Sequence, residues 1–425
     1  MAVGSVGRQA AAPFGRVGGS AMPGQGSIAV VSPEGRLQVA DDLPRTADVV
    51  VVGGGVMGAS TAYHLARREV GDVVLLEREP QLGAMSTGAC AGGIRHQFAT
   101  ETNIRFSIES IRMLERFPEE PGQEIGLRFC GYVFLLTDGA DVEQFRANVS
   151  LQHRLGIETR WLGPEELADL IPLVNLDGVL AGTICDRDGL ADPHGVTEGY
   201  AAGARRHGVR ILTETPVTGI RRDGNRIAGV DTPRGSIDTP VVVNACGAWA
   251  PELGRMVGVD IPIQPIRRQM AVTAPIANLP PHFPFVVFFK ESLYFHREGE
   301  GILTGKSNPV ETPGFKLSVD PEWEEIHLGE AIERMPILGD AGLLSRWAGL
   351  YEVTPDAHPI LGRIPTMKGF YVMAGFSGHG FMHGPVAGKL MAEEIVDGRA
   401  ATVDIDPFRY DRFLVGELHP EYNVI

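Results

Sequence analysis

The chain has 425 residues, of which 44% are hydrophobic and 21% are charged, and its formal net charge at pH 7 is −15. This composition is typical of a soluble globular enzyme with room for two domains. The net negative charge and the lack of a long basic run argue against a nucleic-acid partner. The sequence contains no run of 18 uninterrupted apolar residues, so no membrane span is expected.

Residues 1–45 differ in composition from the rest of the chain. They are rich in Gly, Ala, Ser and Pro, and Arg8 and Arg16 are the only charged residues before Glu34. We predict a flexible tail over residues 1–45. Because the segment carries arginine and few acids, a transit-like segment is the alternative.

The cysteines and histidines indicate which redox compartment and which metal sites to expect. The four cysteines are scattered and form no Cys-x-x-Cys pair, which fits a reduced intracellular setting, so we expect a cytoplasmic location. The twelve histidines show no spacing typical of a metal site on a helix, so no metal is expected.

The first predicted elements are those of a dinucleotide-binding unit. The apolar run of residues 49–52 predicts a buried parallel strand. It leads into Gly53-x-Gly55-x-x-Gly58, after which residues 56–68 have helical spacing. In this pattern the glycines allow a tight turn, close approach to a pyrophosphate, and close packing of helix on strand. A second strand over 72–76 ends at Glu77, 24 residues after Gly53, where an acid is expected to accept hydrogen bonds from the adenosine ribose.

The rest of the chain alternates between short strands and helices. Residues 81–95 form a loop dense in small side chains, which suggests backbone lying against a flat ligand. Spacing predicts helices at 102–117, 164–170, 194–207 and 384–397. It predicts strands at 127–136, 209–212, 217–221, 240–245, 266–272, 285–289, 293–296, 301–305 and 369–375. The run at 240–245 looks like another central strand of the nucleotide sheet, and the four runs from 266 to 305 suggest a separate mixed sheet.

Two segments of the C-terminal third resemble a known family. Residues 349–362, GLYEVTPDAHPILG, and residues 375–385, GFSGHGFMHGP, are similar to motifs of the D-amino acid oxidase superfamily of flavoproteins. Within it the chain resembles the sarcosine oxidase and dimethylglycine dehydrogenase branch, and most closely the β subunits of sarcosine oxidase and dye-linked proline dehydrogenase. The likeness extends from about residue 47 to residue 399.

The resemblance implies FAD as the cofactor and an α/β fold, in which a discontinuous Rossmann-like FAD-binding domain joins a mixed antiparallel-sheet α+β substrate domain. We expect the FAD-binding domain at 46–101, 175–246 and 345–425, and the substrate domain at 102–174 and 247–344. The implied cofactor contacts run from the ADP to the flavin ring: Gly53, Gly55, Gly58, Glu77, Arg78, Ser86, Thr87, Gly92, Gly93, Val217, Gly247, Trp249, Gly378, His379, Gly380 and Phe381. Backbone N–H groups near the flavin would stabilise the negative charge of the reduced ring.

The sequence departs from relatives that attach flavin covalently. Where some relatives carry a tethering histidine this chain has Ala89, and where others carry a cysteine it has Gly349. We therefore predict non-covalent FAD.

The resemblance also implies the substrate site. Arg95 matches an arginine that pairs with the substrate carboxylate, Tyr351 a tyrosine at the same carboxylate, and Tyr294 a wall of the site. The alternatives are a structural ion pair for Arg95 and simple packing for Tyr351. His383 is the remaining catalytic candidate, although a structural role is the competing interpretation.

Two lysines of the monomeric oxidases are replaced here by Met382 and Leu303. The loss of these lysines weakens the case for an oxidase that uses oxygen. A dehydrogenase that passes its electrons to another acceptor is the other interpretation. The predicted reaction is oxidation of the C–N bond of a small secondary or N-methylated amino acid by hydride transfer to flavin N5. Alternatives are a flavoprotein subunit or assembly factor active only with a partner, in a hetero- or homo-oligomer, and an FAD enzyme acting on a 2-hydroxy acid.

Overall fold

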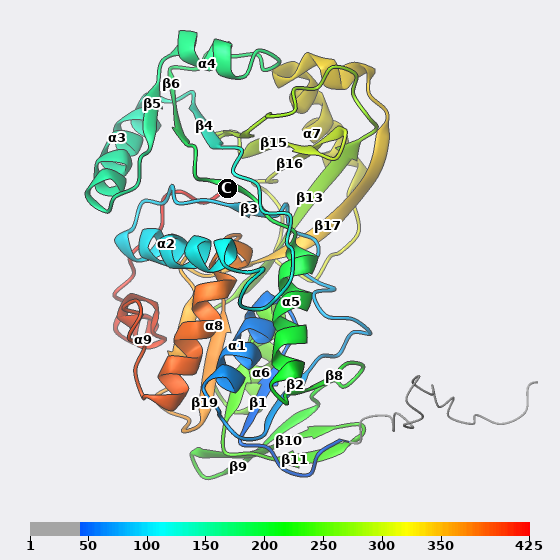
Figure 1. The fold of residues 1–425 in the computed structure, drawn as a ribbon, viewed down its shortest axis with the longest axis vertical. Helices are drawn as coiled ribbons and strands as arrows, with labels where there is room; N and C mark the ends of the chain where they lie inside the picture. Colours follow the sequence, from blue (N-terminus) through cyan, green and yellow to red (C-terminus); the bar gives the residue numbers. More distant parts are fainter. Residues whose placement is uncertain (1–42) are drawn as a thin grey trace, which may run out of the picture. The chain divides into compact units, whose positions relative to one another are not determined.

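A six-stranded sheet in the order β18-β19-β12-β1-β2-β8 organises one half of the molecule (Figure 1). The computed structural model describes residues 43–425. The first four strands of this sheet in the sequence are β1 (Val49–Val52), β2 (Val73–Leu76), β8 (Arg210–Leu212) and β12 (Val242–Asn244). They are parallel, as is β19 (Phe370–Ala374), whereas β18 (Ile360–Arg363) is antiparallel to β19. The predicted strands at 49–52, 72–76, 209–212, 240–245 and 369–375 therefore share one sheet.

The apolar run of β1 is explained by burial on both faces of this sheet. Val49 and Val51 join one core cluster, and Val50 and Val52 join another. Successive strand side chains point to opposite faces, so a strand covered on both sides reads as continuously apolar.

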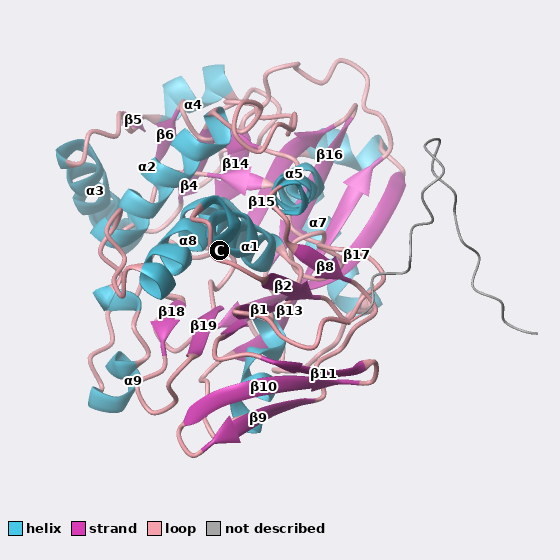
Figure 2. Cartoon of the chain, turned by 60° about the horizontal axis from the view of Figure 1, so that its bottom comes forward, coloured by secondary structure: helices cyan, strands magenta, loops and turns pink. Residues whose placement is uncertain are grey.

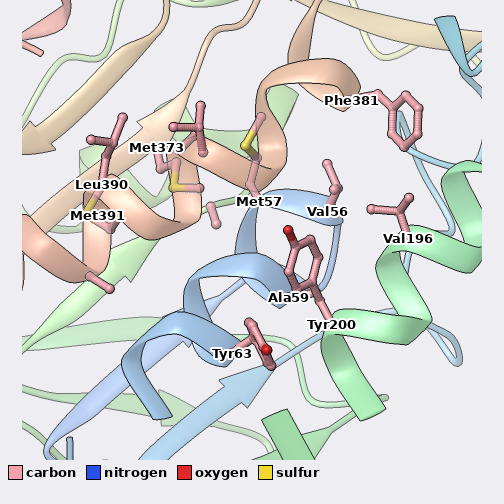
Figure 3. Packing of buried hydrophobic residues seen from close by; sticks show 14 of the residues in the cluster. Val56, Met57, Ala59, Tyr63, Val196, Tyr200, Met373, Phe381, Leu390 and Met391 are labelled. Atoms are coloured by element: carbon pink, nitrogen blue, oxygen red, sulfur yellow. The ribbon is translucent and has the colours of Figure 1, made fainter. Parts of the chain in front are cut away.

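Helices cover one face of the sheet. They are α1 (Val56–Arg67), α5 (Pro193–Arg206) and α8 (Gly380–Val396), and α2 (Glu101–Glu115) packs against α8. Figure 3 shows α1 lying between α5 and α8, with Met57, Tyr63 and Tyr200 among the packed side chains. The opposite face carries α6 (Ala250–Met256) and a three-stranded antiparallel sheet of β9 (Gly219–Asp223), β10 (Arg226–Thr232) and β11 (Gly235–Asp238) (Figure 2).

The second half is an eight-stranded sheet in the order β17-β13-β16-β15-β14-β4-β6-β5. Its strands are β4 (Tyr132–Leu136), β5 (Arg160–Leu162), β6 (Ala181–Cys185), β13 (Gln264–Thr273), β14 (Phe285–Phe288), β15 (Leu293–Glu298), β16 (Gly301–Lys306) and β17 (Leu343–Val353). Only the pair β4–β14 is parallel. The expected mixed sheet is thus present, flanked by α3 (Gly139–Arg154), α4 (Pro164–Leu170) and α7 (Pro321–Arg334).

Several boundaries differ from the predicted ones. Strands β6 and β17 fall within segments expected in the FAD-binding domain, yet both pair within the eight-stranded sheet. Conversely α2 and α6, expected in the substrate domain, belong to the two cores that flank the six-stranded sheet, and α2 packs against α8. The helix α3 was not predicted, because its interior is largely polar and gives little apolar periodicity.

Residues 1–42 of the predicted tail at 1–45 lie outside the described residues. The predicted end of the tail is three residues too late. Asp238 donates its N–H to the Arg45 carbonyl at 2.8 Å, and Ala47 donates to the Asp238 carbonyl at 2.9 Å. Residues 43–45 therefore belong to the folded part. Within residues 43–425, no helix has the length and apolarity needed to span a membrane.

Three further elements are short. They are β3 (Gly93–Ile94), which pairs with β7 (Gly189–Leu190), and α9 (Asp411–Val415) near the end of the chain. After α9 the chain returns to the second half, where Ile425 packs beside the core of the eight-stranded sheet.

Candidate functional site

The first cavity, of about 220 Å³, begins at the carboxyl ends of β1, β2 and β12. Ligands of parallel α/β sheets bind at this edge. The loop after β1 turns sharply at Gly53, whose φ is +106° and whose added Cβ would lie 2.5 Å from the Ala245 carbonyl oxygen. A Cβ on Gly58 would lie 1.8 Å from the Gly53 carbonyl oxygen. Glycine is therefore required at both positions, as the nucleotide fingerprint predicts.

The acid at the end of β2 is tied to the same loop. Glu77 Oε2 accepts a hydrogen bond from the Gly54 N–H at 2.6 Å, and Oε1 accepts one from the Glu79 N–H at 2.8 Å. Each carboxylate oxygen can accept a second hydrogen bond. Since Glu77 also lines the cavity, it can receive a ribose hydroxyl there.

The N-terminus of α1 faces the cavity without a capping side chain of its own. Gly55 is the N-cap residue, and Thr87 Oγ1 accepts the Val56 N–H at 3.2 Å. Gly55, Val56 and Thr87 all line the cavity. A helix N-terminus with free N–H groups stabilises an anion such as a pyrophosphate.

Most of the predicted cofactor residues meet in this cavity. Those that line it are Gly53, Gly55, Glu77, Arg78, Ser86, Thr87, Val217, Gly247, Trp249, Gly378, Gly380 and Phe381. The Arg78 guanidinium lies 3.9 Å from the centroid of a Trp249 ring, so the two form one side of the wall. Gly58 acts in packing instead, and Gly92, Gly93 and His379 line a second cavity.

Glu352 is a wall residue of the first cavity that the sequence analysis did not identify. Its Oε2 is buried and has no hydrogen-bond partner among the described residues. Burial raises its pKa to about 7, although N–H groups of Gly375 and Phe376 act in the opposite direction. A buried orphan oxygen is costly unless a ligand pairs with it. An extended polar molecule such as FAD, with hydroxyls and a carbonyl-bearing ring, fits this requirement.

The second cavity, of about 80 Å³, shares part of its wall with the first. Residues common to both are Ser86, Cys90, Leu350, Tyr351, Gly378 and Phe381. Its remaining lining includes Arg95, Tyr132, Arg268, Tyr294 and His379. A small site rich in cationic and phenolic groups therefore adjoins the long nucleotide-like cavity.

Tyr351 and Tyr294, both predicted as residues of the substrate site, line the second cavity. Burial raises the pKa of Tyr351 and raises that of Tyr294 well above its ordinary value. Both phenols therefore stay neutral and can donate a hydrogen bond near neutral pH.

Arg95 also lines the second cavity, but its guanidinium is already engaged. Nη1 donates to the Gln97 carbonyl, and Nη2 donates to the Asn423 carbonyl at 2.5 Å. The group also lies 3.8 Å from the centroid of the Phe98 ring. The predicted carboxylate contact thus competes with contacts inside the protein.

His383 lines neither cavity, so its predicted catalytic role has no geometric support. Its Nε2 lies 3.1 Å from Ser107 Oγ, and its ring packs against Phe98 and Phe106. Burial lowers its pKa well below the ordinary value. The side chain points between α2 and α8 because it sits on the inner face of α8. The structural interpretation replaces the catalytic one.

Arg268 on β13 is a cation of the second cavity that sequence reasoning missed. Its Nε is buried without a partner, and its guanidinium lies 4.9 Å from the centroid of the Tyr351 ring. The doublet Arg267-Arg268, two adjacent charges within a predicted strand, was the available signal.

The two positions where relatives tether flavin lie against each other. A Cβ on Gly349 would lie 2.8 Å from Ala89 Cβ. Neither residue has a side chain able to form a covalent bond to flavin, which is consistent with the predicted non-covalent attachment.

Among residues 43–425, one group of metal-ligating types is clustered: His96, Cys185 and Asp188. His96 Nδ1 and Asp188 Oδ1 are 2.7 Å apart. Two ligands of one tetrahedral zinc would be separated by about 3.3 Å, given bonds of about 2.0–2.1 Å. Asp188 also accepts the His96 N–H and a Gln97 amide hydrogen, so the cluster is a hydrogen-bonded structural group. The expected lack of a metal stays a prediction.

Comparison with known proteins defines the family. The FAD dependent oxidoreductase (DAO) family matches residues 48–394, and the chain belongs to that family. It is 34% identical over 391 residues to the mitochondrial sarcosine dehydrogenase of Homo sapiens, covering 88% of this chain and 42% of the relative. It is 32% identical over 389 residues to the mitochondrial dimethylglycine dehydrogenase of Rattus norvegicus, covering 86% of this chain and 45% of the relative. The chain thus spans less than half the length of these two relatives.

The fold agrees with solved structures of the family. The crystal structure of L-proline dehydrogenase from P. horikoshii matches with a TM-score of 0.83 and 35% identity, covering 89% of this chain and 100% of that chain. The expected fold class and FAD as cofactor are therefore confirmed.

Proposed function

We propose that the chain oxidises the C–N bond of a small secondary or N-methylated amino acid, with FAD as the oxidant. The observation that carries the proposal is the small cavity of cationic and phenolic groups that shares a wall with the FAD cavity. Relatives named for sarcosine, dimethylglycine and proline support the same class of substrate.

Bound FAD would supply a hydride acceptor at flavin N5. The protein's own residues bind and orient the substrate and exclude water. A free aliphatic amine has a pKa of about 10. The neighbouring Arg95 and Arg268 and the low dielectric disfavour its protonated form. The neutral amine lone pair then forms the C=N bond as the C–H bond loses hydride. Loss of hydride from the neutral amine leaves an iminium ion, and a secondary amine then releases its N–H proton to give the imine. Water hydrolyses this product outside the step.

We further propose that the reduced protein passes its electrons to an acceptor other than oxygen. The lysine associated with oxygen activation in relatives is Leu303 here, a buried residue of β16. The nearby Lys306 donates to the Glu291 carbonyl at 2.6 Å and pairs with Glu330 at 2.9 Å. It lines neither of the two cavities.

The test is an anaerobic screen of amino acids and N-methyl amino acids, monitored by bleaching of the flavin absorbance. Sarcosine, dimethylglycine or proline should reduce the flavin within one turnover. Reoxidation should be slow with oxygen and fast with a dye acceptor. Bleaching by 2-hydroxy acids instead of amino acids would contradict the substrate assignment, and fast reoxidation by oxygen would contradict the acceptor assignment.

A second test concerns the attachment of the flavin. Acid precipitation should release the yellow colour into the supernatant, because Ala89 and Gly349 cannot tether it. Colour that stays with the pellet would overturn non-covalent binding.

A subunit or assembly factor active only with a partner is the alternative, and the chain spans less than half of the length of the two curated relatives. It predicts that the isolated chain binds FAD but shows no bleaching until a partner is added. The expected oligomeric state and cytoplasmic location stay predictions.

A further inference from the structure

We propose that Arg268 binds the substrate carboxylate and that Arg95 is a positioning residue, held in place by residues 421–425. The inference rests on the proposed amino acid substrate of the second cavity. It assigns the charge recognition to a residue of β13 that the family resemblance did not indicate.

Arg95 is committed to the protein's own backbone. The Asn423 carbonyl that receives its Nη2 is fixed by further contacts of the same residue. The Asn423 side chain donates to the Gln97 carbonyl at 3.2 Å and accepts from Asn148 Nδ2 at 3.0 Å. Asn423 is fully buried. A substrate carboxylate that took over Nη2 of Arg95 would leave the buried Asn423 carbonyl oxygen without this donor, which is costly.

Arg268 has the opposite character. Its one hydrogen bond among the described residues runs from Nη1 to the Arg267 carbonyl at 3.1 Å. Its Nε is buried and unpaired, and no carboxylate within residues 43–425 lies within ion-pair distance of it. Burial lowers its pKa, as expected for a cation with few compensating partners. A carboxylate ligand would supply the missing counter-charge and accept hydrogen bonds from the unpaired N–H groups of the Arg268 guanidinium.

The neighbouring Arg267 shows why only one of the pair is available. Arg267 pairs with Glu311 at 2.8 Å and with Asp320 at 3.0 Å. Successive residues of β13 point to opposite faces of the sheet. Arg267 therefore faces the acids near α7, whereas Arg268 faces the second cavity beside Tyr351.

The geometry also predicts selectivity. Arg268 and the neutral hydroxyls of Tyr351 and Tyr294 line the same small cavity. This set suits one carboxylate, with the phenols as additional donors. Amines that lack a carboxylate would leave the cation unpaired and should be poor ligands.

The experiment compares Arg268→Gln, Arg268→Lys and Arg95→Lys in the FAD-loaded protein. The exposed Arg346, which pairs with Glu324 outside the site, provides the matched control Arg346→Gln. Binding is measured by titrating the oxidised flavin spectrum with propionate, which cannot be oxidised at a C–N bond. Anaerobic reduction is measured with proline and with pyrrolidine, which lacks the carboxylate.

We expect Arg268→Gln to weaken propionate binding by about 100-fold, since truncating one partner of a buried charge pair has effects of this order. The preference for proline over pyrrolidine should fall by a similar factor. Arg268→Lys should restore part of both. Arg95→Lys should lower the melting temperature while retaining the preference, and Arg346→Gln should behave as wild type.

The assignment is overturned if Arg268→Gln binds propionate like wild type, if wild type binds no propionate, or if Arg95→Lys alone loses the preference. The proposed function fails separately, if propionate binds through Arg268 but no amino acid reduces the flavin. In that case the carboxylate site stands and the substrate is not an amine.

Discussion

At the scale of single residues, the nucleotide loop depends on the absence of side-chain atoms. A Cβ at Gly58 would overlap the Gly53 carbonyl oxygen at 1.8 Å, and it would also lie 3.4 Å from Cγ1 of Val51. The strand-to-helix turn would have to open, and with it the N–H groups directed at the phosphates.

Gly58→Ala should therefore reduce flavin affinity by roughly tenfold or more, since overpacking of this kind costs about 1–3 kcal/mol. The ratio of flavin absorbance to protein absorbance after purification measures the effect. Gly139→Ala is the control, because Gly139 is exposed at the start of α3 and its Cβ would meet nothing within 4 Å. Equal flavin content in both variants would refute the steric argument.

At the scale of elements, the start of α2 is capped by a residue more than 300 positions away. The N-cap Thr100 makes no capping hydrogen bond of its own. Glu421 instead accepts the N–H groups of Ala99 at 2.8 Å and Thr100 at 3.2 Å, the Thr100 hydroxyl at 2.6 Å and the Asn103 amide at 2.9 Å. A carboxylate at a helix N-terminus also interacts favourably with the helix dipole. Residues 421–425 are thereby anchored beside Arg95.

Glu421→Ala should lower the free energy of unfolding by about 2–4 kcal/mol, because it leaves several buried donors unpaired. Urea denaturation gives the value. Glu417→Ala, an exposed change four residues earlier, should stay within about 0.5 kcal/mol of wild type. If the two variants are equally stable, Glu421 does not cap α2.

At the scale of the whole molecule, the two cavities are assembled from segments distant in sequence. The FAD cavity takes the ends of β1, β2 and β12, and the second cavity takes β13, β17 and the start of α8. Tyr351 and Glu352 are adjacent on β17, and Glu352 lines the first cavity whereas Tyr351 is shared by both. One strand of the second sheet thus carries groups for both ligands.

Glu352 should make the stability of the flavin-free protein depend on pH. Its pKa is raised from 4.5 to about 7 in the folded state, because burial disfavours the carboxylate. Its contribution to stability is therefore fully present below pH 4.5 and is lost as the pH rises through about 7, with a slope of up to about 1.4 kcal/mol per pH unit. The measurement is the difference in unfolding free energy between wild type and Glu352→Gln at pH 5 and pH 8.

Wild type should lose stability relative to Glu352→Gln on going from pH 5 to pH 8. The surface variant Glu325→Gln serves as a control for the change of charge. A difference that does not vary with pH would show that Glu352 is not held neutral by burial.

Local patterns were sufficient for the nucleotide-binding half. The strand at 49–52, the three glycines and Glu77 were found from the sequence because turn geometry and strand burial act over a few residues. Part of the mixed sheet was likewise predicted, from the short apolar strands between residues 266 and 305, whereas β5, β6 and β17 were not predicted. The sequence also located Tyr351 and Tyr294, through the resemblance of their motif and neighbourhood, although not which groups they would face.

The charge recognition was decided only by tertiary structure. Arg95 was a reasonable carboxylate ligand until Asn423, 328 positions away, was seen to hold it. Arg268 became a candidate carboxylate ligand because the acid that pairs with Arg267 lies on the other face of β13. His383 is no longer a catalytic candidate because α8 directs its side chain into the core, against Ser107. A residue type sets which interactions are possible. Long-range packing sets which of them are already made within the protein, and so which buried groups remain free for a ligand.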